Sequence, residues 1–198
     1  MDNGLGLLIP ALLGYALGSI PFGLILTKVA GMGDVRNIGS GNIGATNVLR
    51  TGKKGLAAAT LLLDLVKGFV PVWLVGHYWG GTAAGTAALA AVIGHCFPVW
   101  LKFKGGKGVA TNAGVCFGLA WPIGAAYAVT WLLILALFRF SSLAGMTAVV
   151  AAPIAAWQLD MSEYVPFLVA IAMLIIWLHR ANISRLIGGS EPKVGSKN

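Results

Sequence analysis

The stretch Trp121-Pro122-Ile123-Gly124 lies inside an apolar run that extends from residue 109 to residue 138. At 1.5 Å per residue, a straight helix over this run would be about 45 Å long. The hydrocarbon core of a bilayer is only about 30 Å thick. The run therefore forms either one strongly tilted helix or two short helices that are broken near this stretch.

The composition shows that lipid is the solvent of most of the chain. Of the 198 residues, 58% are hydrophobic and only 10% are charged, and the mean hydropathy is +0.84. A water-soluble domain of this size does not need so much apolar surface. The N-terminus does not resemble a cleavable signal peptide, because it carries Asp2, has no basic segment and continues into a long apolar run.

The distribution of charge decides between the one-helix and the two-helix reading. The apolar runs cover residues 5–27, 56–76, 83–101, 109–138, 142–158 and 164–178. With a break in the fourth run, every Lys and Arg except Lys67 falls on one side of the membrane, and Asp2, Asp160 and Glu163 fall on the other. Without the break, the cations are divided between the two sides, which the positive-inside rule disfavours.

These observations predict an all-α membrane protein that is a bundle of seven transmembrane helices. The N-terminus is expected in the periplasm and the C-terminus in the cytoplasm. Residues 1–188 are expected to form one membrane domain, and residues 189–198 a disordered cytoplasmic tail. Glycines spaced four residues apart, such as Gly14 and Gly18 or Gly114 and Gly118, predict close contacts between helices.

Two glycine-rich polar loops fall on the cytoplasmic side in this topology. The first reads Asn37-Ile38-Gly39-Ser40-Gly41-Asn42-Ile43-Gly44-Ala45-Thr46-Asn47 and is followed by Arg50. The second reads Lys102-Phe103-Lys104-Gly105-Gly106-Lys107-Gly108. Backbone amides, hydroxyls, carboxamides and cations at this density favour the binding of a phosphate. The alternatives are a flexible connector for the first loop and lysines placed only for topology in the second.

Other polar residues lie near these loops or within the spans. His95 precedes the lysine loop near the end of the third span, where it either joins two helices or belongs to the site. Asp64 and Lys67 are three residues apart in the second span, and they either lock that helix into the bundle or support the site. Asn182 follows the last span on the cytoplasmic side. It either belongs to the site or lies in a segment whose cations only set the orientation of the chain in the membrane.

Several reaction types lack their sequence signatures. The Gly-Lys pairs are not nucleotide P-loops, because both the upstream spacing and the following Ser or Thr are missing. The chain has no Gly-x-Ser-x-Gly motif for a nucleophilic serine and no His-x4-Asp pair. Asp34 is the only acid near either loop, so a magnesium site has no carboxylate cluster. We therefore expect no metal and no cofactor, and a substrate that is already activated.

The loops and their flanking segments together resemble the PlsY family, the bacterial acyl-phosphate:glycerol-3-phosphate acyltransferases of the inner membrane. The resemblance runs in order along nearly the whole chain. It is carried by Gly18-Ser19-Ile20-Pro21-Phe22-Gly23, by the first loop from Arg36, by Gly94-His95-Cys96-Phe97-Pro98, by the second loop through Thr111, and by His179-Arg180-Ala181-Asn182-Ile183.

The resemblance implies the transfer of a fatty acyl group from acyl phosphate to the 1-hydroxyl of sn-glycerol 3-phosphate. The products would be lysophosphatidic acid and inorganic phosphate, in the first acylation of phospholipid synthesis. The implied protein is a multi-pass enzyme of the bacterial inner membrane with its active site facing the cytoplasm. It would act as a monomer in contact with membrane lipid, with no nucleic acid as a partner.

The resemblance also assigns residues to the site. Those expected to act in catalysis are Ser40, Arg50, His95 and Lys107. Those expected to bind the substrates are Asn42, Thr46, Asn47, Lys104, Gly105, Gly106, Gly108 and Asn182.

One position departs from the family pattern. The family often has a glutamate between the Arg and the Asn of its last motif, where this chain has Ala181. A general base at that position is therefore excluded, and we expect a substrate phosphate to accept the proton. The alternative function is a small membrane transporter of an organic phosphate, which would also place cationic glycine loops at a membrane face.

Overall fold

The computed structural model describes residues 5–195, and residues 1–4 and 196–198 lie outside the described part. Over the described residues the fold is entirely helical, as predicted. The helices are α1 (Leu5–Gly18), α2 (Phe22–Val29), α3 (Ala45–Leu49), α4 (Lys54–Trp79), α5 (Gly81–Cys96), α6 (Val109–Leu119), α7 (Trp121–Phe138), α8 (Ser141–Gln158), α9 (Val165–Leu178) and α10 (Arg180–Ile187), with short 3-10 turns at Val35–Asn37, Val99–Leu101 and Ser162–Tyr164.

The predicted break in the long apolar run is confirmed. Helix α6 ends at Leu119, Ala120 is extended with φ −162° and ψ 138°, and α7 begins at Trp121. Pro122 falls in the first turn of α7, where its missing N–H removes no hydrogen bond and its fixed φ favours a helix start. The run is therefore two helices and not one tilted helix.

Length and composition do not distinguish all seven predicted spans. Among the described residues, four helical segments are long and apolar enough to cross a membrane: Gly6–Val29, Lys54–Trp79, Gly81–Leu101 and Trp121–Phe138. A fifth is added if Ser162–Leu178 and Arg180–Ile187, which meet at 58°, form one broken span. The seven-span count and the orientation of the termini stay predictions.

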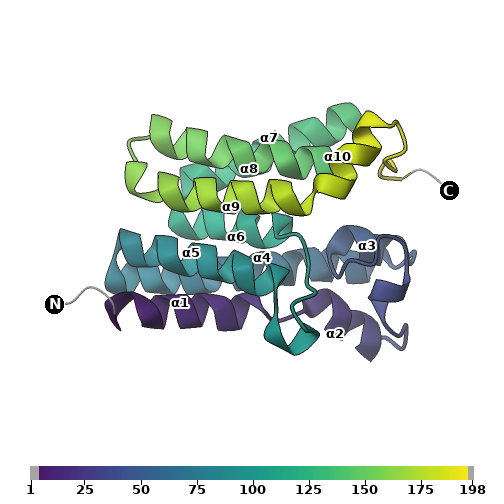
Figure 1. The fold of residues 1–198 in the computed structure, drawn as a ribbon, viewed down its shortest axis with the longest axis horizontal. Coiled ribbons are helices and arrows are strands. Elements are labelled where there is room, and N and C mark those ends of the chain that lie inside the picture. The colour runs from purple at the N-terminus through teal and green to yellow at the C-terminus, as the bar shows by residue number, and fades with distance from the viewer. Residues whose placement is uncertain (1–4, 196–198) are drawn as a thin grey trace.

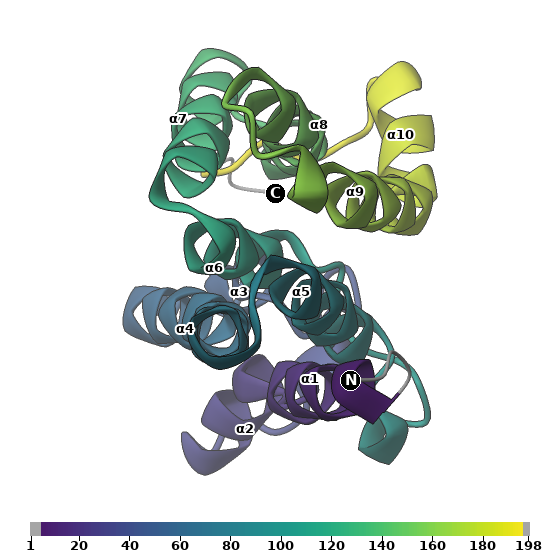
Figure 2. The same cartoon turned by 90° about the vertical axis from the view of Figure 1, so that its left-hand side faces the viewer.

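The helices form two groups joined through α6. Figure 2 shows α1, α4 and α5 on one side of α6, and α7, α8 and α9 on the other. Small residues permit the close contacts, as the sequence predicts: a methyl group at Gly14 or Gly18 of α1 would collide with the backbone of α5, and one at Gly114 of α6 with the backbone of α4. The core between the groups is built from alanine and valine, including Ala88, Val92 and Val115.

Both polar loops lie at one end of this bundle. Figure 1 shows α2, α3 and α10 together at that end, while α1 begins at the opposite end. The disordered tail over residues 189–198 stays a prediction; among the described residues of this segment, Glu191 hydrogen-bonds to α8 and α10 and Val194 N–H donates to the Arg139 carbonyl. The described part of this tail therefore packs against the bundle, because its carboxylate finds hydrogen-bond donors there.

A buried ion pair joins α4 to the end of α1. Lys67 Nζ lies 2.6 Å from Asp64 Oδ1, and both side chains are at most 3% exposed. The same ammonium donates a 2.6 Å hydrogen bond to the carbonyl of Ile20, in the break between α1 and α2. Asp64 also lies 3.9 Å from Nδ1 of His95 on α5. The pair thus ties α4 to the break between α1 and α2, close to His95 of α5, and Asp64 also borders the site described below.

This arrangement predicts opposite outcomes for single and double substitutions. Lys67→Met alone leaves a buried carboxylate without its partner and is expected to cost about 3–5 kcal/mol of stability. The double variant Asp64→Leu/Lys67→Met removes both charges and should recover most of that loss. Thermal unfolding in detergent measures both, and a double variant no more stable than Lys67→Met would contradict this account.

Candidate active site

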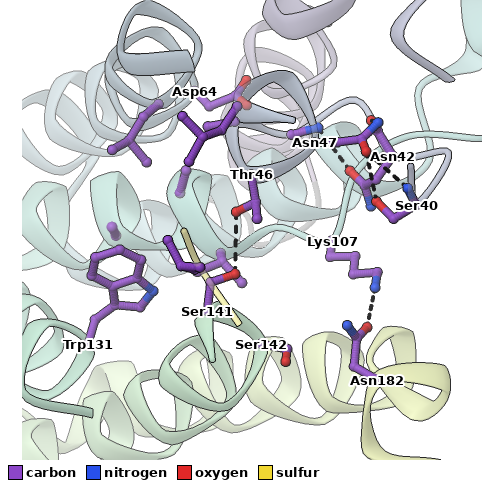
Figure 3. Close-up of a pocket in the computed structure, with 18 of the residues that line it drawn as sticks. Ser40, Asn42, Thr46, Asn47, Asp64, Lys107, Trp131, Ser141, Ser142 and Asn182 are labelled. Carbon is purple, nitrogen blue, oxygen red and sulfur yellow. Dashed lines mark hydrogen bonds between the residues drawn. The ribbon is translucent and has the colours of Figure 1, made fainter. Parts of the chain in front are cut away.

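A cavity of about 690 Å³ opens where the two polar loops meet α8, α10 and the segment after α10. Figure 3 shows polar side chains near Lys107 and Asn182 at one end of it, and Trp131 at the other. Lys104, Gly105 and Gly106 do not line it, although they were expected to bind substrate. The predicted residues that line it are Ser40, Asn42, Thr46, Asn47, Arg50, His95, Lys107, Gly108 and Asn182.

Asn47 organises the first loop from within. Its Nδ2 donates to the carbonyls of Val35, Ile38 and Asn42 at 2.8 to 3.0 Å. Its Oδ1 accepts from the backbone N–H of Ser40 at 3.0 Å and from the Ser40 hydroxyl at 3.3 Å. These bonds use both donors and both lone pairs of the amide. The side chain is 2% exposed, so its geometry favours holding the loop in shape over contacting a ligand.

The glycines of the second loop pack against the end of α5. The N–H of Gly105 donates to the Cys96 carbonyl and that of Gly106 to the His95 carbonyl, both at 3.0 Å. A methyl group at Gly106 would collide with Nε2 of the His95 ring. These two amides are therefore engaged within the protein, and Lys104 is exposed beside them. The loop packs against the His95 ring at Gly106, and the residues that follow, Lys107 and the start of α6, line the cavity.

The start of α6 contributes a second source of positive potential. Gly108 and the first residues of the helix, Val109 and Ala110, line the cavity. The N–H groups of a first helical turn have no partners within the helix, and the positive end of the helix dipole adds to their attraction for an anion. A phosphate near Lys107 would meet both the ammonium and this helix end.

A chain of polar contacts connects the second loop to the C-terminal segment. Lys107 Nζ donates to Oδ1 of Asn182, and Nδ2 of Asn182 donates to Oε1 of Glu191 at 2.6 Å. Oε1 also accepts from the Ser142 hydroxyl at 2.6 Å, while Oε2 accepts from Nε of Arg185 at 2.7 Å. Glu191 therefore holds α8, α10 and, through Asn182, the lysine loop in one arrangement.

The charges at this end shift each other's protonation. Burial lowers the pKa of Lys107 below its ordinary value, and the cations Arg185, Arg50 and Arg180 lower it further, against an opposing effect of Glu191. Partial burial alone would raise the pKa of Glu191, but hydrogen bonds from Ser142, Asn182 and Arg185 outweigh it and lower that pKa. Near neutral pH the site therefore holds an ionised Glu191 among several cations.

Sequence reasoning missed several residues that line this cavity. They are Ser141, Ser142, His179 and Glu191. The Ser141 hydroxyl lies 3.4 Å from that of Thr46, across the cavity (Figure 3). His179 donates through Nδ1 to the Ile175 carbonyl at 2.7 Å, which fixes its ring. The one signal available in the sequence was a lone acid, Glu191, in a basic C-terminal segment, and only the fold brings it back to the site.

Comparison with known proteins identifies the family of this chain. A family model described as glycerol-3-phosphate acyltransferase matches residues 8–189. The glycerol-3-phosphate acyltransferase of Erythrobacter litoralis is 69% identical over 197 residues and covers 100% of both chains. That of Mesorhizobium japonicum is 57% identical over 192 residues, covering 97% of this chain and 98% of its own.

Solved structures extend the match to three dimensions. The crystal structure of PlsY, an integral membrane glycerol 3-phosphate acyltransferase, in its glycerol 3-phosphate form superposes with a TM-score of 0.91 and 38% identity, covering 96% of each chain. Its lysophosphatidic acid form gives a TM-score of 0.89 and 36% identity, covering 96% of this chain and 95% of that one. The chain described here therefore belongs to the PlsY family of integral membrane glycerol-3-phosphate acyltransferases.

Proposed function

We propose that this protein transfers a fatty acyl group from acyl phosphate to the 1-hydroxyl of sn-glycerol 3-phosphate, without a covalent enzyme intermediate. The observation that carries the proposal is the cavity itself, which joins a cationic end to an apolar end. The cationic end contains Arg50, Lys107 and Arg185, and the apolar end contains Leu65 and Trp131. An acyl phosphate has the matching shape, a phosphate joined through one carbonyl group to a long hydrocarbon chain.

The reaction needs little chemistry from the protein. An acyl phosphate is a mixed anhydride, so the substrate hydroxyl forms its bond to the carbonyl carbon while the bond to phosphate breaks. The protein must hold two phosphates close together and stabilise the oxygen that becomes negative. Lys107, Arg50 and the start of α6 offset the repulsion between those phosphates, and the Ser40 hydroxyl lines the same cavity.

The proton of the attacking hydroxyl needs an acceptor. Ala181 cannot serve, and Glu191 is a poor candidate because three side chains donate to it and its pKa is lowered. A general base works best when its pKa lies near the operating pH. We infer that a phosphate oxygen of a substrate accepts the proton, and that Glu191 keeps Asn182 and Lys107 in position.

We further propose that the cavity faces the cytoplasm of a bacterial inner membrane and that a single copy is sufficient. One chain supplies every residue of the site, and the cations gather at one end of the bundle, as the positive-inside rule requires of a cytoplasmic face. The alternative function, transport of an organic phosphate, usually places its polar site near the middle of the membrane between repeated halves. Here the polar side chains lie at the end of the bundle.

The choice of donor provides the first test. Purified protein in detergent is incubated with labelled glycerol 3-phosphate and either palmitoyl phosphate or palmitoyl-CoA. Labelled lysophosphatidic acid is expected with palmitoyl phosphate alone. Product formed only from palmitoyl-CoA would refute the assigned donor, whereas uptake into liposomes without any product would favour transport.

The two lysines of the second loop form a matched pair of variants. Lys107 lines the cavity, whereas Lys104 is exposed outside it. Lys107→Ala is expected to lower kcat/KM for glycerol 3-phosphate roughly 10²-fold or more, as the loss of one preorganised donor does elsewhere. Lys104→Ala should remain close to wild type. Equal losses in the two variants would show that the lysines act only through the charge of the loop.

The lowered pKa of Lys107 predicts a pH dependence with a definite sign. As pH rises, this ammonium loses its proton earlier than an ordinary lysine would, so kcat/KM should fall on the alkaline side. Arginine stays protonated throughout, so Lys107→Arg should move that fall to higher pH, whatever its effect on the maximum rate. A pH–rate profile checks this, with Lys104→Arg as control; coincident alkaline limbs in wild type and Lys107→Arg would contradict it.

A further inference from the structure

The apolar end of the cavity is a groove between three helices. Helix α6 packs against both α4 and α7 and lies between them. On α6 the groove is lined by Ala110, Ala113 and Phe117. Leu65 lines it from α4 and Trp131 from α7. The described residues of α6 and α7 that line it carry no charge; on α4, Asp64 lines the cavity beside Leu65 and is paired with Lys67. The groove therefore suits a hydrocarbon chain that leaves the cationic end and runs along α6.

The length of this groove is comparable to one leaflet of a bilayer. From Gly108 at the cationic end to Phe117, α6 rises about 14 Å at 1.5 Å per residue. Half of a hydrocarbon core of about 30 Å is about 15 Å, which is the depth that one membrane acyl chain occupies. A chain that begins beside Lys107 and spans the depth of one leaflet would thus reach Phe117 with its last carbons.

Phe117 is the last residue of α6 that lines the cavity. The lining of the cavity ends at Phe117 on α6 and resumes only at Tyr127 on α7, so the turn between these helices does not reach it. The Phe117 ring packs edge-to-face on Trp121 at 4.9 Å between centroids. It also lies so close to Gly124 that a methyl group there would collide with it. Helix α7 thus supports the ring from behind and leaves it little room to move deeper.

We propose that Phe117 sets the maximum length of the acyl chain that this protein accepts. The inference rests on the proposed transfer from acyl phosphate and adds a specificity determinant to it. A chain that ends before the ring fills the groove, whereas a longer chain must bend or displace the ring. In apolar pockets, one methylene too many or too few changes kcat/KM by about 10- to 200-fold.

Two substitutions should change the maximum length of the accepted acyl chain in opposite directions. Phe117→Ala removes the ring and should admit longer chains, raising the ratio of kcat/KM for arachidoyl phosphate over palmitoyl phosphate by about 10-fold or more. Ala113 lies one helical turn closer to Lys107 on the same face. Ala113→Phe should therefore shorten the groove by about 6 Å and shift the preference from palmitoyl toward lauroyl phosphate. Val129→Ala is the control, because Val129 is 64% exposed on α7 and does not line the cavity.

The experiment measures kcat/KM for lauroyl, palmitoyl, stearoyl and arachidoyl phosphate in wild type and the three variants. Opposite shifts of the chain-length profile in Phe117→Ala and Ala113→Phe, with none in Val129→Ala, support the proposal. An unchanged profile in both groove variants, or an equal loss with every donor in both, overturns it. Absence of turnover by the wild type with every acyl phosphate would instead refute the proposed function.

Discussion

The contact between the His95 ring and the backbone of Gly106 positions the second loop, and through it Lys107 and the start of α6. His95 is buried in the last turn of α5, and the second loop can cross its ring only because Gly106 has no side chain. The loop is held there by two backbone hydrogen bonds to the last turn of α5. Behind the ring, the Asp64–Lys67 pair fixes α4 against the break between α1 and α2. Where the loop leaves His95, Lys107 and the N-terminus of α6 follow within three residues.

The polar residues of the two loops consequently divide into two groups with different tasks. The side-chain amide of Asn47 and the backbone N–H groups of Gly105 and Gly106 form hydrogen bonds within the protein. Ser40, Arg50 and Lys107 line the cavity, and Figure 3 shows Ser40 and Lys107 there. A membrane protein needs the first group, because loop backbone near the hydrocarbon region is stable only when its polar groups are satisfied internally. The second group can then be held in a fixed arrangement before a substrate arrives.

The C-terminal segment completes the cationic end. Glu191 accepts hydrogen bonds from Ser142 of α8 and Asn182 of α10. It thereby holds Asn182, which accepts a hydrogen bond from Lys107. One carboxylate among several cations also reduces their mutual repulsion while no phosphate is present. The site so formed continues without interruption into the groove along α6, so a single cavity offers one end to phosphates and the other to hydrocarbon.

The sequence by itself determined the helical class, the break before Trp121, the two glycine-rich polar loops and nine of the residues that line the cavity. These features are local, since they follow from hydropathy, from the positions of proline and glycine, and from dense polar composition. Only the tertiary structure decided which loop residues are engaged within the protein and which face the cavity. It alone brought Ser142, Glu191 and Phe117 to the site, because each reaches it through contacts between segments far apart in the chain. Hydrogen-bond partners and the end of a groove depend on how helices pack, and no spacing along one helix encodes them.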